Sequence, residues 1–256
     1  WIPEVCYEKN NVLDNDFKAE AKMQNQNSFS FLDIDFERRS GEITLFLLNI
    51  LLLVFITTYN YEQFFEVAKK SYLSSDTHER VTAVIFSIIM AVGVILFYFK
   101  GGFNFDEKAK NLKKLAKIWI LLNGVLILST IIKNSEYVSF FGLTYKRLGV
   151  YAFLILSIIG LVISFVKITK QKTNAFLFNQ MIWYFYGTIL LCSFVNWGNI
   201  ITHYNISVNK GVEPIFLSGL NFNDEMRRDY FLQNKLDGQY LEISREKEIS
   251  RMQSKT

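Results

Sequence analysis

The sequence predicts an all-α integral membrane protein with about five transmembrane helices, an N-terminal extramembrane arm and a polar C-terminal tail. Half of its 256 residues are hydrophobic and 16% are aromatic, yet 20% are charged, as in an ordinary soluble domain. The charges crowd into a few segments and leave long uncharged runs between them. A helix that faces lipid has no need to alternate apolar and polar faces, so this segregation indicates a bilayer rather than a soluble α-helical core.

Residues 1–40 come before the first apolar run and predict an extramembrane arm on the cytoplasmic side. They are rich in Asn, Asp, Glu and Gln, and the alternation over 29–36 suggests a short strand or a docked extended segment. The chain begins with Trp1 rather than methionine. We therefore expect a processed or partial polypeptide, with further membrane helices before Trp1 as an open alternative.

Five apolar runs follow within residues 41–205. Most approach the roughly 20 residues that a helix needs to cross the hydrocarbon core. The third run is shorter, but Lys117 and Lys133 bracket it, and both ammonium groups can reach the headgroups. None of the runs contains a proline. The expected helices cover residues 42–61, 81–100, 115–133, 146–168 and 176–202.

Residues 206–256 form the predicted tail. Apolar residues there recur at uneven intervals of three to five, which predicts a short amphipathic helix over 223–235. Gly238 would break it, and a second helix would begin near Gln239. A solvated, frayed terminus is the alternative.

The basic residues of the connecting segments predict the orientation. Eleven lysines and arginines fall on the side that holds the arm and the loop between the second and third helices, against six on the other side. Because cytoplasmic loops carry an excess of these residues, we assign the richer side to the cytoplasm. The C-terminus is then external.

Two stretches have a distinctive pattern. Gly142, Thr144 and Tyr145 stand before a Lys-Arg pair in "YVSFFGLTYKRLGVYAFL", and "SFVNWGNIITHYNI" ends a helix near a Tyr-Asn pair. Together with residues 40–54 and 82–104, these stretches resemble a family of bacterial membrane proteins known only as domain of unknown function forty-one seventy-three, related to forty-one fifty-three. The resemblance implies a multi-pass protein of the bacterial inner membrane. It implies no activity.

The predicted spans lack the groups on which membrane chemistry depends. Ion-driven transporters place ionisable side chains inside the membrane, and the five runs have none at mid-depth. The sequence has no paired intramembrane carboxylates and no motif of a nucleophile with its base. These features argue against an enzyme without excluding one. We expect no cofactor and no nucleic-acid partner.

The most promising external surface is the start of the fourth helix. Lys146 and Arg147 lie there beside Tyr145, and cations at a helix N-terminus oppose the helix dipole. Something should compensate them, either an anionic lipid headgroup or a carboxylate of the tail such as Glu213 or Asp224. These three residues are therefore candidates for binding a lipid or a protein partner.

Other polar and small residues suggest helix packing. Gly160 and Ser164 form a small-x-x-x-small pair, and Asn123 and Asn196 are placed for hydrogen bonds between helices. For a metal ion we find only weak candidates, His78 and His203, which could approach each other on the external face. We expect no bound metal.

The sequence as a whole favours a structural or accessory subunit of a bacterial envelope membrane complex. Its expected partners are the lipid bilayer and other proteins of that complex. A transporter or channel component is the alternative, and an external-face metal site or enzyme is the third.

Overall fold

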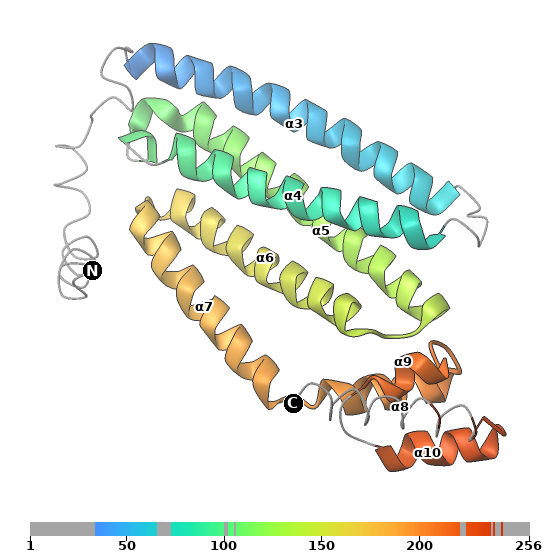
Figure 1. Ribbon diagram of the computed structural model, residues 1–256. Coiled ribbons are helices and arrows are strands. Elements are labelled where there is room, and N and C mark those ends of the chain that lie inside the picture. The colour runs from blue at the N-terminus through green and yellow to red at the C-terminus, as the bar shows by residue number, and fades with distance from the viewer. Residues whose placement is uncertain are drawn as a thin grey trace, which may run out of the picture. The chain divides into compact units, whose positions relative to one another are not determined.

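A computed structural model gives the fold (Figure 1). It describes residues 34–65, 73–99, 102–104, 106–220 and 224–236, together with residues 238 and 242. The predicted strand over 29–36 lies largely outside this part of the chain, but its last three residues are already helical. Most of the predicted arm, residues 1–33, therefore has no structural account.

Every regular element in the described residues is a helix. The long helices α3, α4, α5, α6 and α7 are followed by the shorter α8, α9 and α10, with two 3-10 turns between α4 and α5. Their bounds are α3 Ile34–Phe65, α4 Leu73–Tyr98, η1 Gly102–Asn104, η2 Glu107–Ala109, α5 Lys110–Phe141, α6 Tyr145–Thr169, α7 Asn174–Phe194, α8 Trp197–Val208, α9 Pro214–Ser218 and α10 Asp224–Gln233.

Four of these helices are long and apolar enough to cross a membrane. They are Asp35–Tyr61 within α3, Glu107–Phe141, Tyr145–Thr169 and Asn174–Phe194. Within α4, the segment Thr82–Tyr98 adds a shorter apolar helix. The predicted fold class, an all-α polytopic membrane protein, is confirmed.

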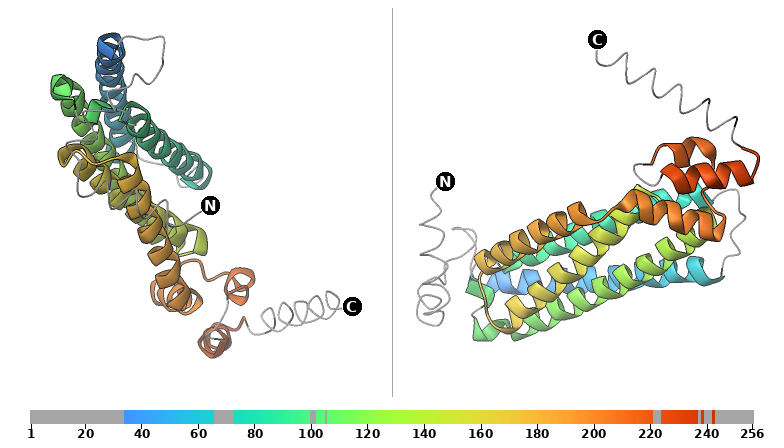
Figure 2. Two further views of the ribbon diagram at one scale, coloured as in Figure 1. Left: turned by 90° about the vertical axis from the view of Figure 1, so that its left-hand side faces the viewer. Right: turned by 90° about the horizontal axis from the view of Figure 1, so that it is seen from below.

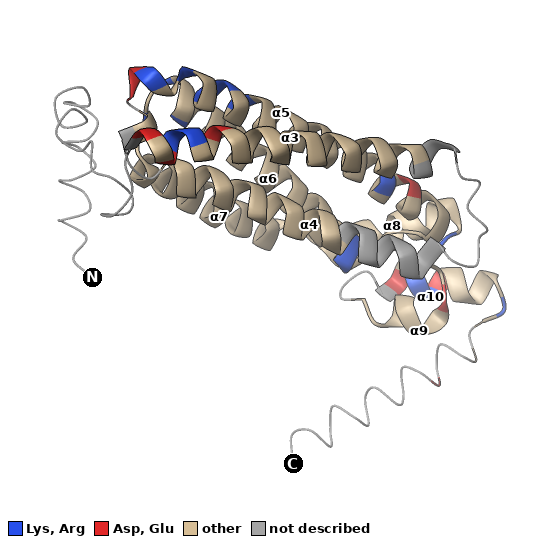
Figure 3. Ribbon diagram, turned by 90° about the horizontal axis from the view of Figure 1, so that it is seen from above, with Lys and Arg blue, Asp and Glu red and all other residues tan. Residues whose placement is uncertain are grey.

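The chain divides into two compact units. The first contains residues 34–132 and 153–188, and the second contains 133–152 and residues from 189 onward. The helices of the first unit run alongside one another as a bundle (Figure 2). Basic residues of this unit gather at one end, on the first turns of α3 and α5 (Figure 3). There Arg38 pairs with Asp35 at 2.8 Å and with Asp106 at 3.5 Å.

The buried face of α3 is narrow. From Leu45 onward its buried residues recur at intervals of three or four, which is the spacing of one helix face; they are Leu45, Asn49, Leu52, Ile56 and Tyr59. The residues between them are exposed and almost wholly apolar, including Phe46, Leu47, Ile50, Leu51 and Leu53. An apolar exposed face is unfavourable in water but favourable in lipid, which explains why the sequence shows no polar side on this helix.

Polar side chains tie the bundle together inside the first unit. Asn49 of α3 donates its side-chain amide to the carbonyl oxygen of Leu115 in α5, at 3.1 Å. Trp119 of α5 donates its indole N–H to the carbonyl oxygen of Ala91 in α4, at 3.3 Å. Each bond joins neighbouring helices where no water competes, which fixes their register.

The predicted fifth helix, 176–202, is two helices. α7 ends at Phe194, and α8 begins at Trp197 after a break at Val195 and Asn196. Asn196 caps the new helix by accepting a hydrogen bond from the backbone N–H of Asn199 at 3.0 Å. A side chain that accepts this bond competes with continued helix formation, so the break needs no proline.

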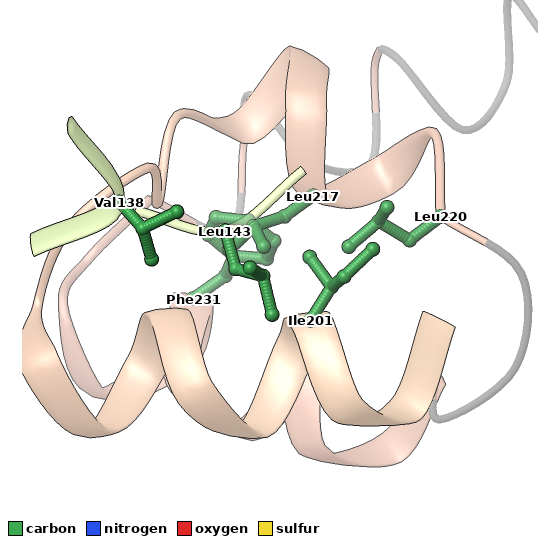
Figure 4. Packing of buried hydrophobic residues seen from close by; sticks show 6 residues of the cluster. All are labelled: Val138, Leu143, Ile201, Leu217, Leu220 and Phe231. Atoms are coloured by element: carbon green, nitrogen blue, oxygen red, sulfur yellow. The ribbon is translucent and has the colours of Figure 1, made fainter. Parts of the chain in front are cut away.

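The second unit has its own apolar core, formed where α8, α9 and α10 meet the turn between α5 and α6 (Figure 4). Phe231 of α10 and Leu217 of α9 are fully buried in it. The remaining members are Val138, Leu143, Ile201 and Leu220. α10 falls within the predicted tail helix over 223–235, whereas α9 was not predicted.

Candidate functional site at the turn between α5 and α6

The connection from α5 to α6 is only three residues long and is closely packed. Gly142 has a φ of 81°, in the left-handed region that glycine adopts without strain. A Cβ atom at Gly142 would lie 2.7 Å from the carbonyl oxygen of Lys210 and 2.9 Å from the side-chain oxygen of Asn205. Only glycine adopts this positive φ without strain and leaves free the space next to these two oxygen atoms, which explains why a glycine occupies this position.

Asn205 of α8 joins the turn to the loop after α8. Its side-chain oxygen accepts from the backbone N–H of Leu143 at 2.6 Å, and its amide donates to the Leu143 carbonyl oxygen at 3.0 Å. The amide also lies 3.2 Å from the Gly211 carbonyl oxygen, which it bonds as well. Asn205 is fully buried, so these partners replace the water that the amide loses.

The two stretches that stood out in the sequence therefore bind each other. Leu143 lies between the Gly and Thr of the first stretch, and Asn205 is the last residue of the Tyr-Asn pair in the second. The site prediction did not include Asn205. The Tyr-Asn pair was a usable signal, but nothing in the sequence indicated a partner 62 residues away.

Arg147 lies half-buried in the first turn of α6. Its guanidinium donates to the carbonyl oxygen of Gly142 and lies over the ring of Tyr137, with 4.2 Å from its central carbon to the ring centroid. The ring of Phe141 is 5.9 Å away. Both α5 rings offer the negative face of a π-system to the cation, and the carbonyl belongs to the negative end of the α5 dipole. These groups offset the unfavourable dipole of α6.

Tyr145 and Lys146 differ from Arg147 in the exposure of their side chains. Both are exposed, as are Phe140 and Phe141 on the last turn of α5. This surface offers an exposed lysine together with exposed aromatic rings, a combination suited to an anionic group at a membrane interface. The binding role of Tyr145, Lys146 and Arg147 stays a prediction.

The predicted packing residues occupy different settings. Gly160 and Ser164 are buried in the first unit, and a Cβ at Gly160 would lie 3.4 Å from the end of the Met181 side chain in α7. Asn123 is buried and donates to the carbonyl oxygen of Trp119 in its own helix, at 2.8 Å. Asn196 is exposed and caps α8.

The two histidines are not brought together by any described contact. His203 is exposed on α8, and the side chain of His78 lies outside the described part of the chain. Among the residues whose side chains are described, no three His, Cys, Asp or Glu residues gather into a metal-binding group. The approach of His78 to His203 stays a prediction.

A second polar cluster closes the basic end of the first unit. Lys167, one of the eleven basic residues that we assign to the cytoplasmic side, is fully buried in the last turns of α6. Its ammonium donates to the side-chain oxygen of Asn174 at the start of α7, and to the carbonyl oxygen of Phe99 at the end of α4, at 3.3 Å. The amide of Asn174 in turn donates to the carbonyl oxygen of Leu96 at 3.2 Å. Three helices thus meet at one cation.

The 3-10 turn η1 completes this cluster. Asn104 is fully buried and donates its amide to the carbonyl oxygens of Lys167 at 3.1 Å and Lys172 at 2.7 Å. Gln171 has a φ of 51°, and the backbone N–H of Lys172 bonds back to the Lys167 carbonyl at 2.8 Å. This is a left-handed helix end that leaves carbonyl oxygens facing Asn104. The cluster is a structural tie rather than a reactive site.

Comparison with known proteins gives a family but no activity. No curated protein and no solved structure matches the chain. One family model matches residues 16–224, which include the α5–α6 turn and Asn205. The chain therefore belongs to the family described as domain of unknown function forty-one fifty-three (DUF4153).

Proposed function

We propose that this protein is a structural or accessory subunit of a membrane complex in the bacterial inner membrane, and that α7 is the helix that contacts its partner. We also propose that the chain is related to the family described as domain of unknown function forty-one seventy-three. The proposal rests on one observation. The rest of the protein barely covers α7, and three aromatic side chains that carry polar atoms lie at the middle of this helix.

The surface of α7 is mostly uncovered. Only 6% of the most apolar 18-residue stretch of α7 is buried, against 44% of the corresponding stretch of α5. Leu177 is buried and Met181 is half-buried against the bundle, while the side chains between and beyond them are largely exposed. α7 also has the lowest mean hydropathy of the four candidate spans. A helix that is most exposed and least apolar is poorly suited to be covered by lipid alone.

The central residues make this mismatch specific. Trp183, Tyr184 and Tyr186 are exposed to 66%, 46% and 60%, and they lie from the tenth to the thirteenth position of a helix of 21 residues. Trp and Tyr are normally enriched at the two membrane interfaces, where the indole N–H and the phenol O–H find water or headgroups. At mid-depth those groups need hydrogen-bond acceptors that lipid chains lack.

A partner helix would supply those acceptors. Backbone carbonyls at a small residue, or Ser, Thr, Asn or Gln side chains, are the groups that serve this purpose between membrane helices. The partner is therefore expected to present a transmembrane segment with polar atoms at mid-depth. The protein itself would contribute a fixed surface, held by the buried polar ties of the bundle.

The experiment is purification of the full chain from its native membrane in mild detergent. We expect a partner at a fixed ratio to the chain, and its loss in the double variant Trp183→Leu, Tyr186→Leu, because leucine keeps the helix apolar but removes both donors. The matched control is Phe46→Leu, Phe86→Leu, two exposed rings without polar atoms. Retention of the partner in the α7 variant, or equal loss in the control, would reject α7 as the interface.

No specific observation favours either of the other two functions. Lys167 is the one fully buried lysine in the described residues, but it lies near the end of α6 and its ammonium is bound by Asn174 and the Phe99 carbonyl. It does not mark a pathway at mid-depth. A transporter or channel component remains the second candidate function, and an external metal site or enzyme the third.

A further inference from the structure

An apolar groove runs between α5 and α6 within the first unit. Its volume is about 610 Å³, and apart from two lysines its lining is apolar. Gly124 is part of its lining, and a Cβ there would meet no atom within 4 Å. Because glycine has no side chain, the space beside Gly124 in the groove stays open.

The two lysines are both at one end of the groove. Lys114 and Lys117 come from the early turns of α5, and the lining continues along that helix to Leu128. The fourteen helical steps from Lys114 to Leu128, at 1.5 Å each, give a length of about 21 Å. One leaflet of the hydrocarbon core is about 15 Å deep, half of the usual 30 Å. The groove thus has the length of one lipid chain with its headgroup at the lysine end.

The lining around the two lysines is apolar and aromatic. Lys117 has its ammonium 5.4 Å from the centroid of the Phe165 ring, which also lines the groove, and Lys114 is exposed. No carboxylate is among the described residues that line it. The nearby Asp106 is occupied by Arg38 at 3.5 Å and by the backbone N–H of Lys108 at 2.8 Å.

We propose that this groove binds an anionic phospholipid, with its phosphate between Lys114 and Lys117 and one acyl chain along α5 and α6. The bilayer offers every acyl chain an equally apolar environment, so burial in the groove gives little preference by itself. Selectivity has to come from the two cations. Charge complementarity therefore decides between a lipid and an uncharged helix as the occupant.

A second groove provides an internal comparison. It lies between α4, α6 and α7, has a volume of about 380 Å³, and has no charged residue in its lining. Gly93 lies in that lining, and like Gly124 it would accept a Cβ without contact. The proposal predicts no preference for anionic lipid there. It also does not depend on a protein partner at α7.

The test measures binding of phosphatidylglycerol and phosphatidylcholine to the purified full chain by native mass spectrometry from detergent. We expect retention of phosphatidylglycerol over phosphatidylcholine. Replacing Lys114→Gln or Lys117→Gln should weaken phosphatidylglycerol binding about fivefold each, the equivalent of about 1 kcal/mol per cation near an anionic headgroup. Gly124→Phe should remove the bound lipid by filling the groove.

The controls separate a groove from general surface charge. Lys108→Gln and Lys110→Gln, each made singly, remove one charge from an exposed lysine at the same end, and Gly93→Phe fills the uncharged groove. None of these controls should change phosphatidylglycerol binding, and Gly124→Phe and the controls should keep the parent melting temperature because their sites are open or exposed. Equal binding of both lipids would overturn the proposal. So would an equal effect of the control lysines, or unchanged binding in Gly124→Phe.

Discussion

Asn205 and Leu143 form a two-way hydrogen-bond pair between a side-chain amide and a backbone peptide unit. The N–H of Leu143 donates to the Asn205 side-chain oxygen at 2.6 Å, and the Asn205 amide donates to the Leu143 carbonyl oxygen at 3.0 Å. The turn between α5 and α6 is thereby held on α8 by one residue. No aliphatic side chain can replace both bonds.

Replacement of Asn205 tests this pair. In Asn205→Leu the buried N–H and carbonyl of Leu143 lose their partners, so we expect a destabilisation of about 2–4 kcal/mol. Asn205→Asp keeps the acceptor but sets a buried carboxylate oxygen against the carbonyl oxygens of Leu143 and Gly211, and should also destabilise. Thermal unfolding in detergent, followed by circular dichroism, measures both. His203→Ala, exposed on the same helix, is the control and should be neutral. A neutral Asn205→Leu would mean that the turn is held by its apolar core alone.

Arg147 should contribute to stability through its ring and carbonyl contacts. Arg147→Ala removes a cation over Tyr137 and a donor to Gly142, so we expect a loss of about 1–2 kcal/mol. Arg147→Lys should restore only part of it, because an ammonium cannot stack and donate as the planar guanidinium does.

The neighbouring Lys146→Ala is the control for Arg147, since Lys146 is exposed and should change the melting temperature little. If an anionic lipid also binds here, Arg147→Ala should lower the amount of phosphatidylglycerol that stays with the purified protein. An Arg147→Ala variant with parental stability and lipid content would remove any role for this side chain.

Substitutions of Lys167 and of its partner Asn174 should have unequal effects on the free energy of unfolding. Asn174→Leu leaves the ammonium in place without its side-chain acceptor, so it should cost about 2–3 kcal/mol. Lys167→Met removes the charge itself and replaces it by an apolar chain of similar length, so it should cost less. In the double variant the cost should be smaller than the sum of the two. Additive costs in the same unfolding assay would show that the two side chains are not coupled.

The sequence was sufficient to predict the long helices, because an uncharged apolar run of about 20 residues is typical of a helix that crosses a membrane. It was less informative about where they end. α5 extends from Lys110 to Phe141, well beyond the predicted 115–133, since its last turns bury Tyr137 and Val138 in the second unit. The apolar run after Phe194 hid the break before α8, for which the Asn196 cap was the only local sign.

The contacts within the candidate site were beyond sequence reasoning for a different reason. Several lysines follow one another around residue 170, and the helical phase alone decides that Lys167 faces inward. The pairing of Asn205 with Leu143 depends on the path of the chain over 62 residues. Arg147 was correctly identified as a cation in need of compensation, but the groups now seen around it are rings and a carbonyl of α5.

The proposed orientation has its own test. Asn111 lies among the lysines at the start of α5, at the end of the bundle that we assign to the cytoplasm, and Ser254 lies in the tail that we assign to the exterior. After replacement of Cys6 and Cys192 by serine, a single cysteine at Ser254 should react with an impermeant maleimide in intact spheroplasts. A single cysteine at Asn111 should react only after lysis. The reverse pattern would invert the topology without affecting the fold.

The most direct measurement is photo-crosslinking from the middle of α7 in the native membrane. A benzophenone amino acid is placed at Tyr184 or Tyr186, and at Phe46 on the exposed face of α3 as the control. We predict a discrete protein adduct of the same mass from both α7 positions, and lipid adducts only from Phe46. Lipid adducts alone from Tyr184 and Tyr186 would contradict the proposal that α7 carries the partner interface.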